Sequence, residues 1–246
     1  INPETLEPRY RVIGCDLWSD EDGFAEQTKS TGVTGICGSG IIEAIGEMFL
    51  AGIIQTDGII DGSLSEKSPR VKSNGKTYDY VISKTEPLIT VTQTDVRAIQ
   101  LAKSALYAGV KLLMEKLGVE TIDRIQLAGA FGSHIDVKYA MIIGLIPDCD
   151  LERVKSAGNA AGTGARIALL NKTARKEIED VVRRVEKIET AVEPKFQEHF
   201  VNAMGLPNTI DEFVNLAKVV NLPERKVGTS SAEGSGEGAR RRRRRR

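Results

Sequence analysis

The hydrophobic positions of this 246-residue chain recur with helical spacing in several segments. After a glycine-rich turn at residues 35–40, apolar side chains at positions 41, 42, 45, 48 and 49 predict an amphipathic helix that ends near Gly52. The longest pattern begins at Thr92, which forms a capping-box motif with Asp95, and it ends at Gly118. One face of this long helix is predicted to hold Val96, Ile99, Leu106, Val110, Leu113 and Leu117.

Shorter elements alternate along the rest of the chain. Strands are predicted at residues 9–15, 125–128 and 154–157, and turn signals between residues 57 and 90 predict a β-hairpin insertion. Helices are predicted at residues 136–143, 166–170 and 173–189, with a short one at 211–220. In the charged helix the side chains expected to face inward are Ile178, Val181, Val185 and Ile188. Because helices and strands alternate, we expect an α/β fold in which helices flank a mixed sheet.

Composition separates a folded part from a tail. We expect residues 1–207 to form the folded domain and residues 208–228 to hold a short helix and a linker. Residues 229–246 contain Gly, Ser and Glu followed by seven arginines, and this composition predicts disorder. Without those arginines, 27 Lys and Arg face 34 Asp and Glu, a net charge of −7. Such an acidic body disfavours nucleic-acid binding, which leaves only nonspecific attraction of polyanions to the arginine tail.

The cysteines and the apolar runs of the chain bear on its cellular location. Cys15, Cys37 and Cys149 lie far apart without metal-ligand spacing, and no secretion signal is visible, so we expect a cytoplasmic protein without a metal site of its own. No apolar run reaches the roughly 20 residues of a membrane helix. The chain begins at Ile1, followed by turn-forming Asn2 and Pro3, and we expect it to be the C-terminal piece of a longer protein.

Three glycine-rich turns each follow a β-prone run, at residues 35–40, 129–132 and 158–164. Such turns expose backbone N–H groups and helix N-termini to an anionic ligand. Neither later turn matches a Walker A loop or a dinucleotide fingerprint. Taken alone, each turn is better explained by close packing of strand on helix, but three such turns and their order along the chain favour a nucleotide site.

Several longer segments carry a resemblance to a known family. They are GICGSGIIEAIGEM, ITVTQTDVRAIQLAKSALYAGVKLLMEKLG, RIQLAGAFGSHID, IGLIPD with the later VKSAGNAAGTGARIALL, and FQEHFVNAMGLP. Over residues 1–207 the chain resembles the C-terminal ATPase domain of reductive activators of corrinoid proteins. These belong to the actin-like, sugar-kinase and Hsp70-type ATPases, so the resemblance implies a ribonuclease H-like lobe. A weaker similarity extends to activators of 2-hydroxyacyl-CoA dehydratases.

The resemblance implies an activity for the whole protein. Reductive activators return an inactive Co(II) corrinoid to Co(I), with an electron from a 2Fe-2S ferredoxin-like domain and with ATP and Mg²⁺ driving the uphill step. The expected partner is the corrinoid protein of a methyl-transfer system. This chain lacks both the cysteine cluster and the Asp-x-Gly-Thr phosphate loop of the superfamily, so we expect it to be inactive alone. An actin-like small-molecule kinase and a docking module for the corrinoid protein remain alternatives.

The same resemblance assigns roles to the turns. Adenine and ribose are expected to lie along Gly129, Ala130, Phe131 and Gly132, and the base side to be bordered by Gly158, Asn159, Gly162 and Gly164. Gly38, Ser39 and Gly40, at a helix start, are expected to donate to a phosphate or the ribose. Asn159 either bonds the nucleotide directly or serves an unusual turn conformation. No catalytic residue and no metal ligand is assigned.

Overall fold

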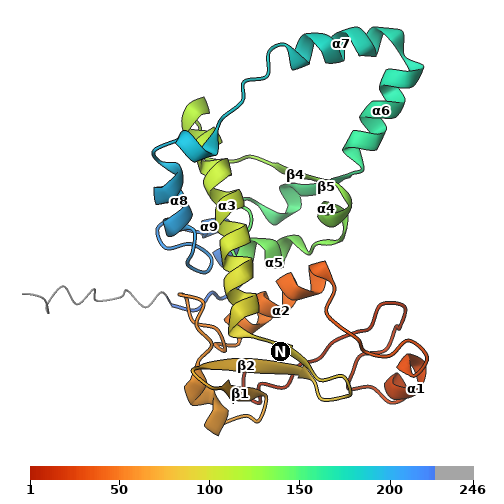
Figure 1. Cartoon of the computed structure of the whole chain (residues 1–246), viewed down its shortest axis with the longest axis vertical. Helices are drawn as coiled ribbons and strands as arrows, with labels where there is room; N and C mark the ends of the chain where they lie inside the picture. The colour runs from red at the N-terminus through yellow and green to blue at the C-terminus, as the bar shows by residue number, and fades with distance from the viewer. Residues whose placement is uncertain (225–246) are drawn as a thin grey trace, which may run out of the picture.

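A long helix, α3 (Gln93–Leu117), runs through the whole molecule and connects its two halves. The structure is a computed structural model that describes residues 1–224 (Figure 1). The half at the start of α3 contains α1 (Phe24–Thr28), η1 (Gly62–Glu66), β1 (Val71–Asn74), β2 (Thr77–Ser83) and β3 (Ile89–Val91). The half beyond it contains β4 (Ile125–Ala128), α4 (Ala130–His134), η2 (Leu151–Arg153), β5 (Val154–Gly158), α6 (Ala160–Leu170), α7 (Lys172–Val182) and η3 (Thr190–Val192). The helices packed along or between these halves are α2 (Gly38–Leu50), α5 (Val137–Ile142), α8 (Phe196–Asn202) and α9 (Val214–Ala217).

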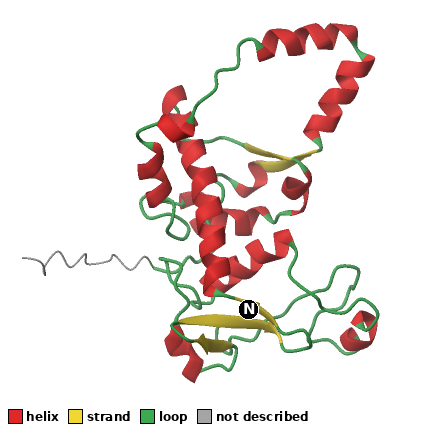
Figure 2. Cartoon of the chain, in the orientation of Figure 1, coloured by secondary structure: helices red, strands yellow, loops and turns green. Residues whose placement is uncertain are grey.

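The strands form two separate sheets (Figure 2). In the first, β1, β2 and β3 are antiparallel, with Val71 opposite Tyr80 and Tyr80 opposite Val91. In the second, β4 and β5 are parallel, with Ile125 opposite Val154. The expected hairpin is therefore present as β1 and β2. The expected α/β fold is present, with small sheets flanked by helices. The expected mixed sheet is not formed by the described residues, because no described strand joins β4 and β5 to the antiparallel sheet.

The ends of α3 are fixed by the residues that the sequence pattern indicated. The Asp95 N–H donates to Thr92 Oγ1 at 3.1 Å, and the Thr92 N–H donates to Asp95 Oδ2 at 2.8 Å, which completes the capping box. Gly118 ends the helix with a φ of 63°, a left-handed conformation that glycine adopts without strain. Both predicted boundaries are confirmed.

The buried face of α3 differs from the predicted one. Leu106, Leu113 and Leu117 are half exposed or more, at 50%, 51% and 75%. The stripe of α3 that is buried instead carries the polar side chains of Gln100, Lys103, Ser104 and Tyr107. The predicted face is confirmed at Val96, which is fully buried, and Ile99 packs against the core. It fails at the three leucines, because the stripe buried there binds the polar backbone of the segment after α8, which lies far away in sequence.

The core surrounds α2, which lies near the N-terminal end of α3 and packs on α5. Ile45, Met48 and Phe49 from α2 are fully buried, as are Met141 and Ile142 from α5. Gly46 makes this approach possible: a Cβ at Gly46 would lie 2.8 Å from the Tyr139 ring. Helix α2 ends as predicted, with Gly52 following in a left-handed conformation.

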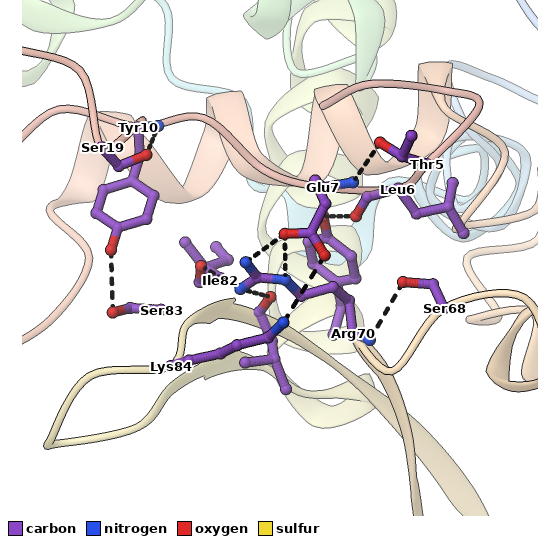
Figure 3. Close-up of polar contacts among 12 residues, drawn as sticks. Thr5, Leu6, Glu7, Tyr10, Ser19, Ser68, Arg70, Ile82, Ser83 and Lys84 are labelled. Carbon is purple, nitrogen blue, oxygen red and sulfur yellow. Dashed lines mark hydrogen bonds and ion pairs between the residues drawn. The ribbon is translucent and has the colours of Figure 1, made fainter. Parts of the chain in front are cut away.

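The first residues do not form the predicted strand at 9–15. Arg11 makes one isolated bridge with Trp18, and Gly14 turns the chain at a φ of 86°. An ion-pair cluster ties this segment to the sheet instead (Figure 3). There the Glu7 carboxylate accepts from the Arg70 guanidinium, which also donates to the backbone carbonyl of Ile82 at 3.0 Å. The pair with Arg70 holds the pKa of Glu7 below its usual range.

Helices α6 and α7 extend away from the rest of the molecule (Figure 1). They contact each other, and neither contains a buried residue. The prediction that Ile178, Val181 and Val185 face inward is wrong within the described residues, since these side chains are 41–68% exposed. Their amphipathic pattern is genuine, but no described element covers it. Helix α6 begins earlier than predicted, at Ala160, and α7 ends earlier, at Val182.

The remaining predictions concern short elements and the tail. Strand β5 and helix α5 are present, and the predicted helix at 211–220 is reduced to the four residues of α9. The predicted disordered segment, residues 229–246, lies outside the described residues. Among residues 1–224, no helix has both the length and the apolar character that a membrane span requires.

Candidate nucleotide site

Two of the glycine-rich turns meet at the carboxyl ends of the parallel strands. The backbone N–H of Gly129, after β4, donates to the carbonyl oxygen of Gly158, at the end of β5, across 2.8 Å. Helices α4 and α6 begin directly after these turns. In parallel sheets ligands bind at this edge, where the loops after the strands lie side by side. The two turns assigned to adenosine therefore lie together in space.

Both turns depend on glycine backbone conformations. Gly129 has a φ of 97° and Gly158 a φ of 60°, in the region that side-chain-bearing residues rarely adopt. A Cβ at either residue would have no atom within 4 Å. Backbone conformation, and not crowding by the described residues, therefore requires glycine, and open space remains beside both turns.

Two serine hydroxyls complete a ring of hydrogen bonds between the turns. Ser133 Oγ donates to the Gly129 carbonyl at 3.1 Å, and Ser156 Oγ donates to Ser133 Oγ at 3.2 Å. The Gly158 N–H then donates to Ser156 Oγ at 3.2 Å. With the direct Gly129–Gly158 bond, the ring fixes each turn relative to the other. The sequence analysis missed both serines, although Ser133 stands four residues after Gly129, the spacing at which a serine bonds back to a carbonyl.

Phe131, in the turn at residues 129–132, lies next to the glycine-rich turn at residues 35–40 and so connects it to the other two. Its side chain is 52% exposed. A Cβ at Gly38, the first residue of α2, would lie 3.6 Å from the Phe131 ring, so the start of α2 and the start of α4 are neighbours. A half-exposed aromatic ring between three glycine-rich turns offers a flat apolar face of the kind on which a nucleobase stacks.

The start of α2 already has internal partners. The Gly40 N–H donates to Cys37 Sγ at 3.3 Å, so it is not a free donor for a phosphate. The Ser39 hydroxyl lies 3.5 Å from the same sulfur. The hydrogen bond with Ser39, followed by that from Gly40, lowers the pKa of the Cys37 thiol. Of the three residues expected to bind phosphate or ribose, Gly40 thus serves mainly as part of the Cys37 cap.

Asn159 is the N-cap of α6. Its Oδ1 accepts from the Gly162 N–H at 2.9 Å, and a Cβ at Gly162 would lie 2.6 Å from Asn159 Nδ2. The Asn159 backbone, at a φ of −78° and a ψ of 72°, is neither helical nor extended, in keeping with the turn role that the sequence suggested as an alternative, although it is not left-handed. Gly162 makes room for the cap, and the Nδ2 group of Asn159 can donate to a ligand.

The two remaining glycines differ in their surroundings. A Cβ at Gly132 would lie 2.9 Å from Leu127 Cβ and 3.0 Å from the Leu127 carbonyl carbon, so Gly132 serves the packing of α4 on β4. Gly164 has no atom within 4 Å of its missing Cβ. Close packing therefore explains Gly132, whereas it does not explain Gly164.

A cavity of about 1030 Å³ adjoins the start of α2. Its wall includes Cys37 and Ser39 on one side and the N-terminal segment at residues 8–13 on the other. Glu43, one turn along α2, also lines it, and burial together with the nearby Asp136 and Glu47 charges raises the Glu43 pKa. The turns at 129–132 and 158–164 do not contribute to this wall. The sequence analysis did not identify Glu43 or the N-terminal segment as part of the site's surroundings.

Comparisons with known proteins identify this architecture. Residues 1–217 match the family described as the C-terminal domain of RACo, the ASKHA domain. The strands, helices and glycine-rich turns described above are thus those of an ASKHA-type domain, and the chain belongs to this family.

Two relatives are similar over most of the chain. Corrinoid activation enzyme RamQ of Eubacterium limosum is 39% identical over 183 residues, which cover 70% of this chain and 31% of that protein. A solved structure, a reductive activator for corrinoid,iron-sulfur protein, superposes with a TM-score of 0.63 at 33% identity, covering 71% of this chain and 29% of that one. The chain thus spans about a third of the length of the relatives that it matches.

An iron–sulfur cluster does not fit the described residues of this chain. Residues 1–224 contain no group of three or more His, Cys, Asp or Glu side chains arranged to hold a metal. Cys149 is buried, and Cys15 and Cys37 take part in separate hydrogen bonds, to Gln27 and with Ser39. A 2Fe-2S cluster needs four ligands in one place. We therefore derive no electron-transfer step from these cysteines.

Proposed function

We propose that this chain is the adenosine-binding side of an ATPase domain in a reductive activator, which returns a corrinoid methyl-transfer protein from Co(II) to Co(I). The membership of the ASKHA family and the names of both relatives support this activity over dehydratase activation or a small-molecule kinase. The partner in the proposal is a corrinoid protein, and ATP with Mg²⁺ is the energy source. Electron transfer through a 2Fe-2S cluster belongs to a part of the whole protein outside these residues.

The observation that carries the proposal is the ring of hydrogen bonds that joins the turns at Gly129 and Gly158 beside the half-exposed Phe131. The residues present fit an adenosine group: glycine turns with open space around them, an aromatic face, and the free Nδ2 of Asn159. A ribonuclease H-like lobe would place these features at the carboxyl edge of its sheet. When bound, ATP would supply the free energy of its hydrolysis, and this chain would hold and orient the adenosine.

The test is nucleotide binding to the intact protein that contains this chain. Gly129→Val introduces a branched side chain at a left-handed φ, and we expect it to weaken ATP binding by 10-fold or more, roughly 1.4 kcal/mol. Gly75→Val, at a left-handed glycine in the β1–β2 hairpin, is the matched control for backbone strain. Unchanged ATP affinity in folded Gly129→Val would refute the proposed site. Loss of Co(II) reduction without loss of ATP binding would place the defect elsewhere.

A further inference from the structure

The segment after α8 has a role that the nucleotide site does not explain. We call this segment, residues 203–216, the strap. Its first residues, Ala203-Met204-Gly205-Leu206-Pro207, are the end of the family-like segment FQEHFVNAMGLP. It lies against α3, the half with the three-stranded sheet and the half with the glycine-rich turns. Its buried residues are Ala203, Leu206, Pro207, Asn208, Phe213 and Leu216.

Polar side chains on the buried stripe of α3 bind the strap's backbone. Lys103, with no exposed surface, donates from Nζ to the carbonyl of Gly205 and to that of Pro207, the latter at 2.8 Å. Gln100 Nε2 donates to the Met204 carbonyl at 2.7 Å. Three carbonyl groups of the strap, those of Met204, Gly205 and Pro207, thereby accept hydrogen bonds from two side chains one helical turn apart. This explains why a helix stripe of ordinary polar residues is buried.

The strap also contacts the half that contains the three-stranded sheet. The Leu206 N–H donates to the Thr56 carbonyl at 2.8 Å. Gln100 Nε2 donates to the Asp57 carbonyl at 3.0 Å as well as to the strap. The loop after α2 and the strap are therefore held by the same α3 side chain.

Contacts at the other edge of the strap reach the half with the glycine-rich turns. The Asp148 carboxylate accepts from the backbone N–H groups of Asn215 and Leu216 at 2.8 and 3.0 Å. Gly144, just after α5, lies directly under the strap: a Cβ there would be 1.9 Å from the Pro207 carbonyl oxygen. The segment from α4 to Asp148 continues directly from the turn at residues 129–132.

We propose that residues 203–216 fix the half with the glycine-rich turns relative to the three-stranded sheet, and that the Lys103 amine is the central attachment of this strap. The buried amine is essential because it satisfies two carbonyls at once. Either protonation state of a lysine carries at least two N–H groups, so both bonds persist whether or not the amine is charged. A side chain of similar shape without donors would leave two buried carbonyls unpaired.

The experiment is hydrogen exchange of the 246-residue chain, followed by mass spectrometry of peptides. Lys103→Met keeps the length of the side chain and removes its donors. We expect amides in the strap and in residues 144–148 to exchange about 10-fold faster or more, the effect of losing one to two buried hydrogen bonds. Amides of β2 should keep their wild-type rates. Lys116→Met is the matched control on α3, since Lys116 pairs with half-buried Glu193 at 2.7 Å near the helix end, away from the strap.

If the strap amides of Lys103→Met exchange at wild-type rates, the proposal is overturned, because the aliphatic part of the side chain would then be enough to hold the strap. Uniformly faster exchange across the chain would overturn it too, since no separate strap would exist.

Two further variants make the test independent of how Lys103→Met folds. Gly144→Ala places a Cβ where it would lie 1.9 Å from the Pro207 carbonyl oxygen and so displaces that carbonyl, and we expect the same localised increase in exchange. In Lys103→Ala, the lost group corresponds to n-propylammonium, and added n-propylammonium chloride should restore strap protection, whereas n-propanol should not. Restoration by propanol to the same extent would show that filled volume matters and would refute the role of the amine.

Discussion

The Gly129 N–H donates to the Gly158 carbonyl oxygen across 2.8 Å, and this bond joins two glycine-rich turns that are separated by 29 positions in the sequence. Parallel pairing of β4 with β5 places both turns at one edge of a sheet. The ring of serine hydroxyls around the bond and the half-exposed Phe131 beside it give the site its shape.

Phe131→Ala removes the aromatic face of the proposed adenosine site. We expect ATP affinity to fall by about 5- to 100-fold, because stacking of a base on an aromatic side chain is worth about 1–3 kcal/mol. Isothermal titration of the intact protein with ATP measures the change. Leu117→Ala, which truncates a similarly exposed apolar residue at the far end of α3, should leave ATP affinity unchanged. Equal affinities of wild type and Phe131→Ala would remove Phe131 from the site.

The serine ring predicts non-additive effects on binding. Ser133→Ala and Ser156→Ala each break the ring, so either should weaken ATP binding by about 2- to 10-fold, the range expected for a hydrogen bond worth about 0.5–1.5 kcal/mol. The double variant should lose little more than one single variant, because the ring is already open. Additive losses in the full double-mutant cycle would mean that the serines act separately. Ser156→Thr, which keeps a hydroxyl, is the rescue control.

Alanine substitutions at Gly132 and at Gly164 should have opposite effects on the stability of the fold. Gly132→Ala would force a Cβ to 2.9 Å from Leu127 Cβ, and we expect it to destabilise the fold by about 1–3 kcal/mol. Gly164→Ala has open space on α6, so it should stabilise the fold by up to about 1 kcal/mol. Thermal unfolding measures both. If Gly164 borders the nucleotide as proposed, Gly164→Ala should nevertheless weaken ATP binding; a variant that is stabler and binds ATP normally would exclude Gly164 from the site.

Because Lys103 is buried, we expect the stability of the fold to depend on pH. Burial lowers the pKa of Lys103 to about 7, against an ordinary value of 10.5. The unfolded chain therefore binds more protons than the folded chain between about pH 7 and 10.5, so the free energy of unfolding should rise with pH there, by up to about 1.4 kcal/mol per pH unit. Denaturant unfolding at pH 6.5 to 9 measures this slope. Lys103→Met should flatten it relative to Lys116→Met, and equal slopes would show that Lys103 does not titrate in this range.

Local sequence signals determined the elements that short-range chemistry controls. The capping box at Thr92 and Asp95, the left-handed Gly118 and the β1–β2 hairpin all occur where the pattern placed them, because each depends on residues a few positions apart. The glycine-rich turns at residues 129–132 and 158–164 were also visible in the sequence and lie at strand ends as expected, whereas no strand precedes the turn at 35–40 in the described residues. The resemblance that these motifs carry over residues 1–207 is confirmed by the family match over residues 1–217.

Tertiary structure decided which faces are buried and what each glycine does. Periodicity assigned Leu106 and Leu113 to the core, but the buried stripe of α3 carries Gln100 and Lys103, because the carbonyls they bind belong to a strap about 100 residues away. No local pattern records such a distant backbone partner. For the same reason the sequence could not distinguish Gly132, which packs on β4, from Gly164, which has open space around it. The sequence thus specified the turns and the helix ends through nearby residues, whereas distant contacts determined burial, the serine ring and the strap.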